Sequence, residues 1–206
     1  MLFQVLEYLC PAAISLEMSR FSYRFRQRQR HRWLKRLQEL AFALDKAALE
    51  GLQRLIDLPF EFKAAQRYAR KHRLPLYLTD LSAPAQKYLR QLDHLLETGD
   101  ISFLKRLGQA LWEEPQKHLS LAPRAIQNPE RFFLHFNWRW KPEDLRRDSI
   151  LASRIRRRLR HRTPLVHIGG YEHLLPYPGR LLKQLEDLKP AVIFLWERNP
   201  AKEAEG

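Results

Sequence analysis

The sequence predicts an α/β fold in which a mostly parallel central sheet is covered by helices. Short apolar runs that are typical of buried strands alternate with longer segments whose apolar residues recur at helical spacing. The chain has 206 residues, of which 45% are hydrophobic and 29% charged, and this suits one domain with a proper core. We therefore expect a single domain over residues 1–198, followed by a polar tail over residues 199–206.

Local patterns predict the individual elements. Apolar residues at helical spacing indicate a helix from Leu2 to Leu9, which Pro11 ends. The short apolar run between Pro11 and Glu17 favours a buried strand. Similar patterns predict strands at residues 12–16, 76–79, 165–168 and 191–196, and helices at residues 2–9, 24–36, 37–58, 61–72, 85–111, 144–162 and 181–188. The 85–111 segment is expected to break near Gly99, and the proline-containing residues 116–137 to form an irregular connection.

Composition limits the classes of protein to consider. The single cysteine, Cys10, excludes a disulfide framework and a multi-cysteine zinc site, and it fits the reducing cytosol. No apolar run approaches the roughly 18–20 residues of a membrane-spanning helix. The apolar start lacks a basic leading segment and is interrupted by Glu7, which argues against a signal peptide. We expect a cytoplasmic protein without a transmembrane segment.

An internal repeat is the most informative pattern in the chain. Residues 184–195 align with residues 5–16 at an offset of 179 positions, and seven of the eleven positions from Leu6 to Leu16 are identical. Any helix, proline and buried strand would look partly alike, but the shared Leu-Glu and Pro-Ala pairs favour a duplication. The repeat predicts a two-repeat architecture with a helical insertion over about residues 85–140. The segment before the second copy, residues 164–177, has no counterpart before Met1, so the first copy is expected to lack its strand and loop.

One glycine-histidine motif could carry chemistry. The apolar run 165–168 is followed by Gly169, Gly170, Tyr171, Glu172 and His173. Glycines at the carboxyl end of a parallel strand allow a sharp turn into the crevice where α/β sheets bind ligands. His173 would then be placed for general-base or metal-ligand chemistry. The alternative is a histidine that caps the next helix or lies exposed in a loop.

The order of several short motifs resembles the TraB/PrgY–TIKI superfamily, which is related to ChaN and the erythromycin esterase-like proteins. Gly170-x-x-His173, with the helix, proline and strand that follow, is one of these motifs. The others are residues 59–65 leading to 76–80, residues 147–152 before the glycine-histidine strand, and residues 14–17. The resemblance covers nearly the whole chain, and only the order of the motifs is distinctive.

The resemblance implies a hydrolase of peptidase or esterase type that acts on a small molecule or a peptide. It assigns His173, Glu17 and Arg147 to the catalytic site, with His173 and Glu17 as ligands of a divalent metal (Mn²⁺, Co²⁺ or Zn²⁺). Around these residues, Gly169, Gly170, Glu172, Glu61 and Asp80 would line the cleft. The first glycine-histidine motif of the family has no counterpart here, and one histidine with one or two carboxylates holds a metal weakly.

Simpler roles remain for these residues. Glu17 could pair with Arg20 or Arg24, and Arg147 could be solvated among its basic neighbours. Glu61 and Asp80 could serve as a helix N-terminal charge and a turn residue. The chain could also be an inactive member of the family, or one that a partner chain completes. A homo-oligomer is possible.

The net charge of +14 suggests a second function. Much of this charge lies in two arginine clusters, residues 20–36 and 146–162. Arg24, Arg26, Arg28 and Arg30 alternate with aromatic and amide residues, a pattern that could bind nucleic acid or another polyanion. The alternative is a solvated helix face. The aromatic segment 132–140, with His135, could line a pocket or cover one end of the sheet.

Overall fold

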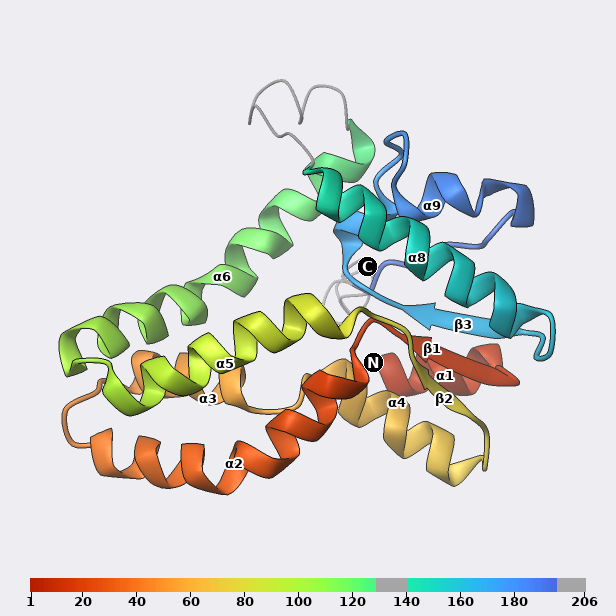
Figure 1. Ribbon diagram of the computed structural model, residues 1–206. Helices are drawn as coiled ribbons and strands as arrows, with labels where there is room; N and C mark the ends of the chain where they lie inside the picture. The colour runs from red at the N-terminus through yellow and green to blue at the C-terminus, as the bar shows by residue number, and fades with distance from the viewer. Residues whose placement is uncertain (129–140, 196–206) are drawn as a thin grey trace, which may run out of the picture.

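The computed structural model describes residues 1–128 and 141–195 (Figure 1). The helices and strands lie in the following order along the chain: α1 (Leu2–Leu9), β1 (Ala13–Leu16), α2 (Arg20–Leu40), α3 (Lys46–Ile56), α4 (Phe60–Lys71), β2 (Leu76–Leu78), α5 (Ser82–Thr98), α6 (Ile101–Gln127), α8 (Pro142–Leu159), β3 (Leu165–Ile168), η1 (Tyr171–Leu174), α9 (Leu181–Gln184) and η2 (Glu186–Leu188). The chain is thus a mixed α/β protein, as predicted.

The described strands form one parallel sheet in the order β2-β1-β3. β1 lies in the centre and pairs with both neighbours, so that Ile14 faces Leu76 on one side and Val166 on the other. All four residues of β1 are buried. Because β1 is hydrogen-bonded on both sides, a further strand could join only at the outer edge of β2 or β3.

The prediction of a fourth strand is wrong for the described part of residues 191–196. Residues 191–195 form no strand, and Trp196 lies outside the described residues. Val192 and Ile193 are exposed, so these strand-forming side chains have neither a ladder partner nor a core to cover. Leu195 alone packs against the apolar core beside β1. The duplicated architecture inferred from the repeat stays a prediction.

Helices cover both faces of the sheet. Side chains alternate along a strand, and Ile14, Leu16 and Ile168 face a core that α1 and α4 complete with Leu6 and Phe62. On the opposite face, Leu165 packs against buried side chains of α8, of α9 and of the residue that follows α9, namely Leu151, Ala152, Ile155, Leu181 and Leu185. α8 therefore lies directly over the sheet face that carries the polar side chains described below.

A helical arm extends from the sheet and has a core of its own (Figure 1). Its buried side chains come from α2, α3, α5 and α6, so the helical part includes residues well before the predicted insertion at 85–140. The arm contains the close crossing of α3 and α6, where a Cβ on Gly51 would lie 1.9 Å from the Gly108 carbonyl oxygen. Only glycine permits the two backbones to approach so closely.

The prediction of an irregular connection is wrong over residues 116–127, because α6 continues to Gln127. Two prolines lie within it, although a proline removes one backbone donor and usually kinks a helix. Packing on other elements outweighs that cost: α6 crosses α3, and Ala125 near its end packs with Leu175 in a small apolar cluster. Residues 129–140, including the aromatic segment and His135, lie outside the described residues. Within residues 1–128 and 141–195 no helix has the length and apolarity to cross a membrane.

Candidate functional site

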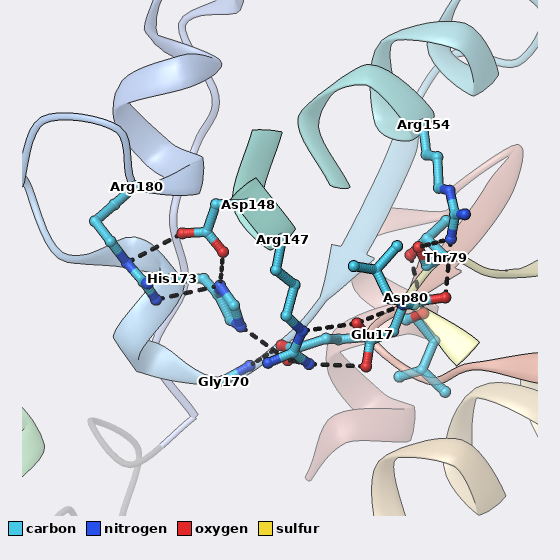
Figure 2. A network of polar contacts seen from close by, with 11 residues as sticks. Glu17, Thr79, Asp80, Arg147, Asp148, Arg154, Gly170, His173 and Arg180 are labelled. Atoms are coloured by element: carbon cyan, nitrogen blue, oxygen red, sulfur yellow. Dashed lines mark hydrogen bonds and ion pairs between the residues drawn. The ribbon is translucent and has the colours of Figure 1, made fainter. Parts of the chain in front are cut away.

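Polar side chains converge where the three parallel strands end (Figure 2). Glu17 follows β1 directly, Asp80 comes two residues after β2, and the Gly169–Gly170 turn follows β3. Carboxyl ends of parallel strands meet at one edge of a sheet, which is where α/β folds bind ligands. α8 crosses this edge and adds Arg147 and Asp148.

Glu17 is the centre of the cluster. Its Oε1 accepts hydrogen bonds from Arg147 Nη2 at 2.6 Å and from His173 Nε2 at 2.8 Å, and its Oε2 accepts from the Gly170 N–H at 2.9 Å. Burial alone would raise the pKa of Glu17, but His173, Arg147 and the Gly170 N–H lower it to about 2. Glu17 is therefore a carboxylate at neutral pH, and its partner is Arg147 rather than the nearby Arg20 or Arg24.

His173 lies between two carboxylates. Its Nε2 contacts Glu17, its Nδ1 lies 2.5 Å from Asp148 Oδ1, and its side chain is only 8% exposed. Burial would lower the pKa of His173, but the hydrogen bonds and charges of Asp148 and Glu17 raise it to about 9. At neutral pH both ring nitrogens donate, and His173 is an imidazolium. The structure thus buries His173 in the cluster instead of leaving it in an exposed loop.

Arg147 connects the ends of β1 and β2. Its Nε and Nη2 donate to the two oxygens of Asp80 at 2.7 and 2.8 Å, a bidentate pair, and Nη2 also reaches Glu17. These carboxylates raise the pKa of Arg147 although burial opposes the shift. Arg154 strengthens the same connection, because its Nη1 donates to the carbonyl oxygens of Thr79 and Asp80. Arg147 is therefore held by two ion pairs.

Asp148 and Arg180 belong to the cluster but were absent from the residues predicted from sequence. Asp148 is fully buried, and its Oδ2 accepts from the Leu181 N–H and from Arg180 Nε, both at 3.0 Å. Arg180 Nη2 also lies 3.3 Å from His173 Nδ1, so Asp148 balances two positive groups. A signal existed in the sequence: Asp148 has the helical spacing of the apolar residues Leu151 and Ile155, which places it on the same face of the helix.

His167 is a second buried histidine that the sequence reasoning missed. The Thr79 hydroxyl donates to the Leu16 carbonyl oxygen, so Ser15 must donate its only proton to Thr79 Oγ1 at 3.1 Å. His167 Nδ1, 3.0 Å from Ser15 Oγ, must then be the donor of that pair. Nε2 is left as a buried acceptor with no hydrogen-bond partner among the described residues. Burial lowers the pKa of His167 to about 4, so this imidazole is neutral.

The remaining predicted residues lie at or near the cluster in different ways. Glu61 is in the first turn of α4, where burial, reinforced by the charge of Glu17, raises its pKa. A Cβ on Gly169 would lie 2.9 Å from Glu17 Oε2, which would force that carboxylate to shift, and in tight contact with His167 Nε2 at 3.1 Å. Glu172 takes part through its carbonyl oxygen, which accepts from Arg180 Nε at 3.2 Å.

The donor set does not fit the metal that the family resemblance implies. Both nitrogens of His173 already have carboxylate partners, and the Glu17 oxygens are taken by a guanidinium, an imidazolium and a backbone N–H. A cation, Arg147, thus stands between the carboxylates of Glu17 and Asp80. Across residues 1–128 and 141–195 no three histidine, cysteine, aspartate or glutamate side chains are grouped to hold a metal.

The four arginines of the predicted polyanion site have different surroundings. Arg26 donates to the carbonyl oxygens of Leu55 and Asp57, and burial lowers its pKa. Arg30 lies 3.6 Å from a carboxylate oxygen of Asp57. Only Arg24 and Arg28 are exposed without a hydrogen bond or ion pair within the part of the chain that the structure describes.

No family model matches the chain, and no curated protein or solved structure matches it significantly. The likeness to the TraB/PrgY–TIKI superfamily therefore stays a prediction from the order of short motifs.

Proposed function

We propose that the chain is a hydrolase of esterase or peptidase type whose active site is the cluster of Glu17, Arg147 and His173. One observation carries the proposal: the imidazolium of His173 is buried between Asp148 and Glu17 at the carboxyl edge of the parallel sheet. A histidine oriented by a carboxylate at one nitrogen is the usual arrangement for proton transfer at the other. The sequence motifs that resemble a hydrolase superfamily support the same reaction class.

His173 acts as the general acid in this proposal. Asp148 holds the Nδ1–H, which fixes the ring and directs the Nε2–H at the position that Glu17 Oε1 occupies. Water adds to the acyl carbon and gives its proton to the free acceptor His167 Nε2. A leaving-group oxygen or nitrogen in place of the Glu17 contact accepts the His173 Nε2 proton as its bond to the acyl carbon breaks. Arg147 and the Gly170 N–H keep Glu17 in place, and the guanidinium stabilises negative charge that develops on the substrate.

His167 is neutral at the pH where His173 is protonated, so it can accept a proton. Environments that push two titratable groups apart in pKa often divide the acid and base roles of a site. Here His173, with a pKa of about 9, keeps a proton to donate, whereas His167, with a pKa of about 4, keeps a free acceptor nitrogen. His167 Nε2 is next to the Gly169 turn, on the same side as Glu17 Oε2.

The test is a survey of hydrolysis with nitrophenyl esters and fluorogenic peptides, run with and without Mn²⁺, Co²⁺ and Zn²⁺. If any substrate turns over, His173→Gln and Asp148→Asn should each lower kcat by at least about 100-fold, the usual scale of a lost proton-transfer group. His31→Gln, a change at an exposed histidine, should leave kcat unchanged. Turnover that survives His173→Gln, or no turnover of any ester or peptide, would argue against the proposed function.

A further inference from the structure

The outer face of α8 differs from the face that packs on the sheet. Side chains of Asp148, Leu151 and Ile155 are buried, whereas Ser149, Ser153, Arg157 and Arg160 are exposed at helical spacing on the other side. An exposed stripe of hydroxyl and guanidinium donors therefore runs along the helix, outside the cluster at the sheet edge.

This stripe borders a hollow of about 390 Å³ between α8 and the end of α9. It is an open depression rather than an enclosed cavity, so a ligand in it would stay partly in contact with solvent. We call this depression the α8 hollow. Its lining residues are Ser149, Ala152, Ser153, Arg156, Arg157, Arg160 and Gln184.

Of the three arginines that line the α8 hollow, Arg156 has a carboxylate partner among the described residues and the other two do not. Arg156 is fixed by the carboxylate of Asp187 and by the Gln184 carbonyl oxygen, which its Nη2 reaches at 2.7 Å. Arg157 and Arg160 make no side-chain hydrogen bond or ion pair with any residue in the described ranges 1–128 and 141–195. These two neighbouring guanidinium groups are thus available to an anion.

The two ends of the hollow differ in chemistry. Ser149 and Arg160 are eleven positions apart, which corresponds to about 16 Å along a helix. Hydroxyl groups lie at one end and the uncompensated guanidinium groups at the other. A ligand with one doubly charged end and a neutral, hydroxyl-rich remainder matches this division better than a chain of evenly spaced charges does.

We infer that the α8 hollow binds an organic phosphate, with the phosphoryl group on Arg157 and Arg160 and the hydroxyl-bearing part along Ser149 and Ser153. A phosphomonoester dianion offers three acceptor oxygens, which suit two guanidinium forks. Serine hydroxyls can donate to sugar hydroxyls or accept from them. The inference is independent of the proposed hydrolase function because it uses other residues on the opposite face of α8.

The experiment is calorimetric titration of the full chain with inorganic phosphate, ribose 5-phosphate, adenosine 5′-monophosphate and adenosine. We expect the phosphorylated compounds to bind with Kd near or below about 1 mM and adenosine not to bind. R157Q/R160Q should weaken ribose 5-phosphate at least about tenfold. S149A/S153A should weaken ribose 5-phosphate but not inorganic phosphate.

The matched control is R70Q/R90Q, which removes the same charge from two exposed arginines on α4 and α5. It should leave each Kd within about twofold of the wild-type value. No binding of either organic phosphate, or equal losses in R70Q/R90Q and R157Q/R160Q, would overturn the inference.

Discussion

At the scale of single residues, two histidines, His167 in β3 and His173 in η1, have opposite protonation states. His173 is stabilised as a cation by Asp148 and Glu17, whereas His167 is buried with one nitrogen bonded to Ser15 and the other without a partner among the described residues. Both pKa values should control how folding stability depends on pH.

We predict a stability maximum near pH 6.5. The pKa of His173 rises from 6.5 to about 9 on folding, so its contribution is complete below pH 6.5 and is lost as the pH rises through 9. The pKa of His167 falls from 6.5 to about 4, so its contribution is complete above pH 6.5 and is lost on acidification. Glu17, with a pKa of about 2, loses its contribution as the pH falls from 4.5 through 2.

Urea unfolding between pH 3.5 and 9.5 measures both limbs. His173→Gln should remove most of the alkaline decline, on the order of 3 kcal/mol, and His167→Gln should flatten the decline between pH 6.5 and 4. His31→Gln, at an exposed position, should change neither limb. A wild-type alkaline limb that persists in His173→Gln would show that His173 is not held as a cation.

Single side chains also show how far sequence reasoning reached. Glu17, Arg147 and His173 were named because motif order marks strand ends, and the structure brings these three together. Asp148 and His167 were missed because each sits inside a regular element. Their roles depend on the neighbouring element that packs on them, here α9 and β1, which no local pattern specifies.

At the scale of elements, the crossing of α3 and α6 depends on two glycines. A Cβ on Gly51 would lie 1.9 Å from the Gly108 carbonyl oxygen, and one on Gly108 would lie 2.2 Å from that of Ala48. Gly51→Ala would stabilise an isolated helix by about 1 kcal/mol. In this chain we expect it to destabilise the fold by about 1–3 kcal/mol, because the backbones must separate.

Denaturant unfolding of Gly51→Ala and Gly108→Ala tests this prediction. Gln53→Ala, an exposed change in the same helix, serves as the control and should stay within about 0.5 kcal/mol of the wild type. An increase in stability on Gly51→Ala would mean that the two helices do not cross at these residues.

Some helices and strands were predicted correctly from sequence patterns and others were not. Strands β1, β2 and β3 were predicted within a residue or two, because short apolar runs bounded by proline or glycine leave few alternatives. The apolar run at residues 191–195 resembles these strands in composition and was wrongly predicted to be a strand. Both sides of β1 are already paired with β2 and β3, so no position beside β1 is left for it. The prolines of α6 predicted an irregular segment, but packing against other elements keeps this segment helical.

At the scale of the whole molecule, the charge of +14 predicts salt-sensitive binding to polyanions. Of the four arginines named from the pattern, only Arg24 and Arg28 lack a partner among the described residues, so they should carry the contact on α2. We expect R24Q/R28Q to elute from heparin at lower salt and to reduce the slope of log K against log salt by about two. R70Q/R90Q is the charge-matched control, and identical elution of the two double variants would refute a role for α2.

The adjacent pair Arg147 and Asp148 gives α8 a mechanical property. Arg147 fastens this helix to the ends of β1 and β2, and Asp148 fastens it to η1 and α9. Because these two residues are adjacent on one helix, a shift of α8 relative to the sheet would change the contacts of Glu17 and of His173 at the same time.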